Sequence, residues 1–120
     1  MRGPERPCEP QAFLEAIDGD AEAYGQMVDL FRETARVQVD RSVAAAQAGC
    51  PTELREALHA LAGSLAIVGA RPSLRRIEAM QGALVRRDRG ELLRLADGFP
   101  SEFEAVCAEM DRLREPCARR

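Results

Sequence analysis

Apolar residues recur every three or four positions through four long segments of this chain, and glycine or proline residues separate the segments. This spacing places the apolar side chains on one face of an α-helix. In the second segment the spacing is that of a coiled-coil seam, formed by Leu54, Leu58, Leu61 and Leu65. No stretch of useful length alternates apolar and polar residues as a half-buried strand does. The pattern therefore predicts an all-α protein, an antiparallel up-down four-helix bundle with a short extra N-terminal helix.

Breaks and candidate caps predict where these helices begin and end. The short extra helix is expected from Pro10 to Ile17, with Gly19 ending it. The four long helices are expected over residues 20–48, 52–68, 73–87 and 88–114. Asp20, Thr52 and Ser73 are candidate N-caps, because a side-chain oxygen there can accept a first-turn backbone N–H.

The last long segment contains Gly98 and Pro100, residues that usually interrupt a helix. The apolar phase nevertheless continues across them through Leu92, Ala96, Phe99, Phe103, Val106, Met110 and Leu113. A new helix would be expected to reset that phase, so we predict one helix with a bend near Pro100. The alternative is a separate helix capped by the Ser101–Glu104 box.

Length and composition indicate a single soluble domain. The chain has 120 residues, of which 46% are hydrophobic and 31% charged, and this supports one modest core. We expect the domain over residues 10–115, with a flexible lead-in over 1–9 and a flexible tail over 116–120. No run approaches the ~18 apolar residues of a membrane span, and the first residues lack the apolar stretch of a secretory signal. A cytoplasmic monomer with no membrane partner is therefore expected.

The reactive residue types exclude several kinds of chemistry. All 17 basic residues are arginine, so reactions that need a lysine amine are excluded. With one histidine, a catalytic triad or dyad could form only around His59. Cys8, Cys50, Cys107 and Cys117 are far apart and form no C-x-x-C pair, which argues against a zinc site. We expect Cys107 in or near the core and Cys8 and Cys117 at frayed ends.

Charge is distributed unevenly along the chain. Residues 9–33 hold seven acids and one arginine, whereas residues 71–94 hold seven arginines and three acids. The net charge of −3 provides no overall attraction to nucleic acid, and no nucleic-acid partner is expected. The basic segment could instead steer an acidic protein partner.

His59 falls about 140° from the leucine seam on a helical wheel, so its ring is expected in solvent. Arg55, Ala62 and Ala66 share its stripe, and Gly63 lies one turn beyond it. A glycine inside a helix costs about 1 kcal/mol relative to alanine, so its presence invites a reason. One reason is clearance, because alanine and glycine beside an imidazole let another protein approach closely. The alternative reason is only that the sequence is rich in alanine.

The stretch from His59 to Ala70 resembles the signature of histidine-containing phosphotransfer (HPt) domains, commonly written H-x-L-K-G-S-x-x-x-x-G-A. The matching residues are His59, Leu61, Gly63, Ser64, Gly69 and Ala70. The resemblance implies a carrier in a multistep phosphorelay, in which His59 takes a phosphoryl group from a receiver-domain aspartate and passes it to another. It implies a receiver domain or hybrid sensor kinase as partner. It implies no enzyme activity and no cofactor of its own, because the receiver supplies Mg²⁺ and the acidic pocket.

Two positions depart from the usual pattern of that family. Ala62 stands where members usually have lysine, and Gln81 stands where many have the glutamate that orients the imidazole. Gln81 can still accept a hydrogen bond, but it carries no charge. Arg55 is the candidate substitute cation, with Arg71 a weaker one. These departures leave an alternative function open, a catalytically silent bundle that binds and regulates a receiver domain or sensor kinase.

Overall fold

The computed structural model describes residues 5–114, and this part of the chain forms helices and no strand. The helices are α1 (Gln11–Ala16), α2 (Ala21–Ala48), α3 (Pro51–Ile67), α4 (Arg71–Val85) and α5 (Arg89–Arg112). The all-α prediction is confirmed. Across residues 5–114, no helix combines the length and the apolar content that a membrane crossing requires.

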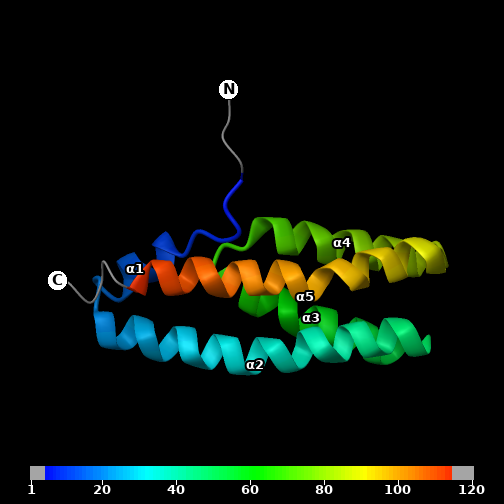
Figure 1. Ribbon diagram of the computed structural model, residues 1–120, viewed down its shortest axis with the longest axis horizontal. Coiled ribbons are helices and arrows are strands. Elements are labelled where there is room, and N and C mark those ends of the chain that lie inside the picture. Colours follow the sequence, from blue (N-terminus) through cyan, green and yellow to red (C-terminus); the bar gives the residue numbers. More distant parts are fainter. Residues whose placement is uncertain (1–4, 115–120) are drawn as a thin grey trace.

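The four long helices form a closed ring of neighbours. α2 packs against α3 and α5, and α4 packs against the same two helices. The short α1 lies at the end of the molecule where α2 begins and α5 ends (Figure 1). The body is elongated, with principal extents of 49 × 35 × 20 Å. Each long helix therefore presents one face to the core and one face to solvent.

The core is aliphatic, with a small aromatic cluster between α2 and α5. All four leucines of the α3 seam are buried, as the spacing predicted. The rings of Phe31 and Phe103 lie 5.8 Å apart between centroids. The Tyr24 hydroxyl donates a hydrogen bond to the Met110 carbonyl at 3.1 Å, so the buried phenol is satisfied. These contacts hold the first half of α2 against the last turns of α5.

α5 runs without interruption through Pro100, so the prediction of one helix is confirmed and the alternative of a second helix is wrong. The guanidinium of Arg76, on α4, packs beside this point. It donates a hydrogen bond to the Leu95 carbonyl at 2.7 Å and forms an ion pair with Glu102. Gly98 leaves room for it, because a Cβ there would lie 2.8 Å from Arg76 Nη1. The bend near Pro100 stays a prediction.

The helix starts follow the sequence only in part. Asp20 caps α2 by accepting a first-turn N–H at 3.0 Å, as predicted. Thr52 does not cap α3, because the helix begins one residue earlier at Pro51. Ser73 does not cap α4, which has Pro72 in its first turn, and it is buried instead. Proline suits a first helical turn because its φ is fixed and the N–H it lacks would have no partner there.

Residues 8 and 9 lie against the bundle, so the prediction that Cys8 sits at a frayed end is wrong. Cys8 is fully buried, with Sγ 3.7 Å from the Val106 carbonyl oxygen, and burial raises the pKa of its thiol to about 12. The Glu9 N–H donates to the carbonyls of Val68 and Gly69 at 3.1 and 3.2 Å. The expected flexible lead-in is therefore packed at these residues.

Gly69 is required by this packing. Its φ is 64°, and a Cβ there would lie 2.5 Å from the Glu9 carbonyl oxygen. Any other residue would strain the backbone and clash with the incoming segment.

Cys107 is buried as predicted. Cys117 and the expected tail over residues 116–120 lie outside the described residues.

Candidate functional site

His59 lies on the solvent-facing side of α3, near the middle of the helix. The leucine seam holds the opposite side of α3 in the core, and His59 is exposed as its wheel position predicted. Within residues 5–114 the imidazole takes part in no hydrogen bond or ion pair. Both ring nitrogens are thus available to a molecule that approaches from outside.

The imidazole lines a hollow of about 310 Å³ between α3 and α4. Arg55 lies one turn before His59 on α3, while Gln81, Leu84 and Val85 come from α4. The structure therefore brings the predicted residues Arg55, His59 and Gln81 together around one space. No side chain of the described part forms a hydrogen bond or an ion pair with Arg55 or Gln81. The Arg55 guanidinium and the Gln81 amide can therefore contact a chemical group bound to the His59 imidazole.

The face of α3 that follows His59 carries small, exposed residues. Gly63 and Ala66 are exposed, as predicted, and a Cβ built on Gly63 meets no atom within 4 Å. No contact inside the described bundle therefore requires glycine at this position. Ala62 differs from the expectation, because it is half-buried and packs against the core. Ala62 follows His59 by three residues, which places it about 60° from His59 around the helix axis. This rotation moves the Ala62 side chain away from the exposed face of α3.

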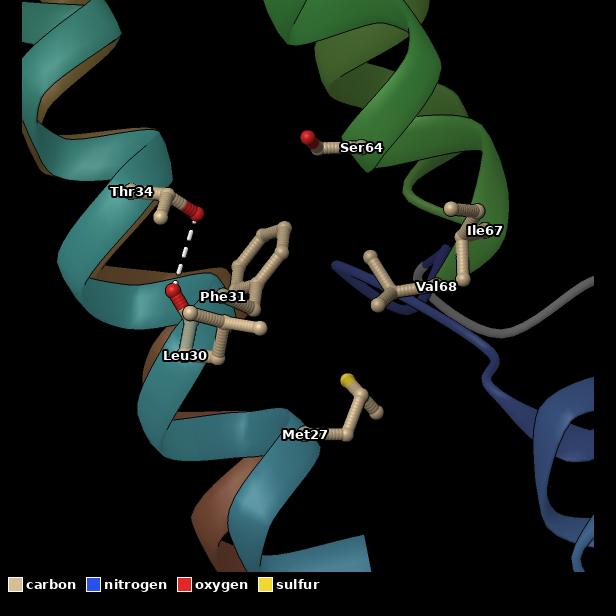
Figure 2. Close-up of a pocket in the computed structure, with 7 residues that line it drawn as sticks. All are labelled: Met27, Leu30, Phe31, Thr34, Ser64, Ile67 and Val68. Carbon is tan, nitrogen blue, oxygen red and sulfur yellow. Dashed lines mark hydrogen bonds between the residues drawn. The ribbon is translucent and has the colours of Figure 1, made fainter.

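A second hollow, of about 150 Å³, lies between α2 and α3 on the other side of the His59 stripe. It is lined by Met27, Leu30, Phe31, Thr34, Ser64, Ile67 and Val68, and Figure 2 shows these side chains reaching into it from both helices. Leu30 is 62% exposed and Ile67 is 60% exposed. The apolar spacing along the sequence does not predict this hollow. Leu30 and Ile67 are apolar residues out of phase with the buried faces of their helices, and that mismatch is the signal that marks them.

Much of the basic segment over residues 71–94 is engaged within the protein. Arg75 pairs with Glu5, Arg76 with Glu102, and Arg94 with Glu91. Arg89 donates hydrogen bonds to carbonyls at the end of α2. The pairs of Arg75 and Arg94 are exposed and contribute little to stability, whereas the Arg76–Glu102 pair is partly buried. All three pairs reduce the positive field available for steering a partner. Within residues 5–114, no group of three or more His, Cys, Asp or Glu side chains is placed to hold a metal ion.

Comparison with known proteins gives one match. A protein-family model described as Hpt domain matches residues 26–116. The matched region contains nearly all of α2, all of α3, α4 and α5, and both hollows that flank His59. Neither the search of curated proteins nor that of solved structures returned a match.

Proposed function

Because the chain belongs to the Hpt domain family, we propose that it carries a phosphoryl group on His59 between the aspartates of two receiver domains. Hpt domains are phosphocarriers that interact with receiver domains and kinases in two-component systems. The proposal places this chain in a multistep relay, in the cytoplasm, on an antiparallel up-down arrangement of its four long helices. The partner receiver would supply Mg²⁺, and this chain would hold no cofactor.

The transfer step is a displacement at phosphorus. The unprotonated nitrogen of the neutral His59 imidazole attacks the phosphorus of the receiver's aspartyl phosphate. A P–N bond forms, the P–O bond to the aspartate breaks, and the carboxylate leaves with the electron pair. The other ring nitrogen keeps its proton, and the ring becomes positively charged. The reverse displacement by a second receiver's aspartate returns the neutral imidazole and empties the carrier.

The observation that carries this proposal is an exposed, unpaired imidazole sharing one hollow with Arg55 and Gln81. Arg55 can offset charge on the phosphoryl oxygens, as the lysine of other members would. The Gln81 carbonyl oxygen can accept a hydrogen bond from the protonated ring nitrogen. It brings no negative charge, so it stabilises a positively charged ring less than a glutamate would.

A silent regulatory bundle is the second candidate, and Ala62 and Gln81 favour it. The position that usually supplies a lysine is here a half-buried methyl group. The position that often supplies a carboxylate is here a neutral amide. A bundle with these side chains could keep its receiver-binding face while transferring slowly or not at all.

Incubation with phosphorylated receiver domains encoded in the same genome distinguishes the two candidates. The carrier acquires acid-labile, alkali-stable label, and His59→Gln abolishes that label. Helicity and the melting temperature should stay unchanged, because His59 is exposed and makes no contact in the core. A wild-type protein that binds a receiver but never acquires label is the silent regulator. Label that survives His59→Gln contradicts the assignment of the phosphoacceptor.

A further inference from the structure

Arg76 on α4 makes a partly buried polar contact with α5, the helix that lies beside it (Figure 1). The guanidinium donates a hydrogen bond to the Leu95 carbonyl and forms an ion pair with Glu102. The side chains of Arg76 and Glu102 are 24% and 19% exposed, and no other ion pair within residues 5–114 has both members less than a quarter exposed. Charge-assisted contacts of this kind are strong and directional, and solvent screens them less than exposed pairs.

Two residues of α5 that are unusual inside a helix make room for this contact. Pro100 has no N–H, so the Ala96 carbonyl lacks its usual helical donor. Arg76 supplies a donor to the adjacent carbonyl, that of Leu95. Gly98 has no side chain, and a Cβ there would lie 2.8 Å from Arg76 Nη1. The proline and the glycine therefore both lie where the guanidinium meets α5.

This contact is the polar link between α4 and the other helices. Within the described residues, no side-chain hydrogen bond or ion pair joins α4 to α3 or α2. The ion pair of Arg75 on α4 reaches Glu5, in the segment before α1. The remaining contacts of α4 with the bundle are made by its buried apolar face. Apolar contact is non-directional and permits packed helices to slide slightly, so Arg76 fixes how far α4 lies along α5.

The position of α4 along its neighbours determines where Gln81 lies. Gln81 follows Arg76 by five residues, which is about 7.5 Å along the helix axis and about 140° around it. Arg76 therefore faces α5, while Gln81 faces the α3/α4 hollow that it shares with His59. The turn that joins α3 to α4 ends at Ala70, eleven residues before Gln81, and constrains that part of α4 only weakly. Releasing Arg76 from α5 would thus displace Gln81 relative to His59.

We propose that Arg76 is a positioning residue, which holds α4 against α5 and thereby keeps Gln81 beside His59. This inference rests on the proposed function, in which the Gln81 carbonyl oxygen accepts a hydrogen bond from the ring of His59. Arg76 does not line the hollow, so it touches no reacting atom. Its effect on phosphoryl transfer passes through Gln81 alone.

Two substitutions release the contact in different ways. Arg76→Met removes the guanidinium and keeps an apolar side chain. Gly98→Ala keeps Arg76 but places a methyl group against its guanidinium, and alanine is favoured over glycine in a helix, so this variant should fold. The matched controls are Arg36→Met and Gly90→Ala. The first breaks an ion pair between α2 and α5, and the second fills an exposed glycine position on α5.

Transfer from a phosphorylated receiver domain of the same genome is measured in single turnover, at saturating receiver and at a temperature where every variant is folded. Gln81→Ala should slow transfer about fivefold, the effect of one lost hydrogen bond. Arg76→Met and Gly98→Ala should slow transfer by up to the same factor, and both controls should transfer as wild type. Either releasing variant combined with Gln81→Ala should be no slower than Gln81→Ala alone, because no Gln81 side chain is left to position.

A purely structural role for Arg76 would give a different pattern. Both releasing variants would then slow transfer as much in the Gln81→Ala protein as in the wild type, and the two factors would multiply. That result overturns the inference, and so does a wild-type rate for both Arg76→Met and Gly98→Ala.

Nuclear magnetic resonance gives a readout that needs no transfer. His59 is the only histidine of the chain, so its ring protons are assigned without ambiguity. Both releasing variants should shift the resonances of the His59 ring and of the Gln81 side-chain amide, and the two controls should shift neither. Unshifted resonances in both releasing variants overturn the inference.

The proposed function fails in a different way. A wild-type protein that is never labelled refutes the carrier function, and the resonances alone then decide whether Arg76 places Gln81 beside His59. Normal labelling of the wild type, with wild-type rates for Arg76→Met and Gly98→Ala, leaves the carrier function standing and refutes the inference.

Discussion

Replacing Gly63 with alanine should make the protein more stable and its partner binding weaker. Gly63 lies inside α3, is exposed, and has no atom within 4 Å of the place where a Cβ would be. Alanine is favoured over glycine in a helix interior by about 1 kcal/mol, and no internal clash opposes this gain. For a domain of this size, that difference corresponds to a rise of about 4 °C in melting temperature.

The same methyl group stands one turn from His59, on the face that a receiver must approach. Interfaces pack as densely as protein interiors, and forcing an extra methyl group into such packing costs about 1–3 kcal/mol. A loss of about 1.4 kcal/mol corresponds to a tenfold weaker complex. We therefore expect Gly63→Ala to weaken receiver binding by about tenfold, and Gly63→Gln to weaken it more.

Thermal unfolding followed by circular dichroism and titration with a receiver domain measure the two effects. Gly90→Ala is the control, because Gly90 is an exposed helical glycine on α5 whose added Cβ would meet only Asp88 Oδ1, at 3.9 Å. It should raise the melting temperature and leave receiver binding unchanged. A Gly63→Ala protein that melts higher and binds as wild type would refute the clearance argument. One that melts lower would refute the stability argument.

Three further changes have defined outcomes. Arg55→Ala should slow phosphoryl transfer several-fold at an unchanged melting temperature, and an unchanged transfer rate would leave Arg55 as an ordinary surface residue. Gly69→Ala should lower the free energy of unfolding in urea by about 2 kcal/mol or more, because the new Cβ meets the Glu9 carbonyl at 2.5 Å with φ at 64°. The buried Cys8 thiol has its pKa raised from 9.0 to about 12, so its contribution to stability is full below pH 9.0 and is lost as the pH rises towards 12. The difference in unfolding free energy between wild type and Cys8→Ala should narrow over that range, and a constant difference would contradict it.

The helices could be predicted because their apolar spacing is a direct result of the helical period. That period carries the phase of α5 across Pro100, where the local preference of proline alone would have predicted a break. The starts of α3 and α4 were predicted too late, because Thr52 and Ser73 are good capping residues and Pro51 and Pro72 already serve the first turn. A capping side chain and a first-turn proline both favour a helix start, at different residues. The sequence alone does not show which of the two preferences determines the start.

The site could be predicted only as far as one helix determines it. The exposure of His59 and Gly63 follows from the wheel position on α3 alone. The placement of Gln81 beside His59 depends on how α4 lies against α3, and the family resemblance supplied it. The burial of Cys8 and the α2/α3 hollow depend on contacts between distant segments. No periodicity within a single segment reports such contacts.

The burial of Cys8 means that the cooperative folding unit is longer than the matched region. Residues 26–116 match the family model, but Cys8 packs against α5, and Glu9 closes over the turn between α3 and α4. A fragment that begins at residue 26 would lack the contacts of Cys8 and Glu9. It would also lack the Asp20 cap of α2 and the hydrogen bond from Tyr24 to α5. It would open a cavity along the edge of the core and uncouple the start of α2 from the end of α5. The smallest stable fragment should therefore begin before Cys8, eighteen residues ahead of the first matched residue.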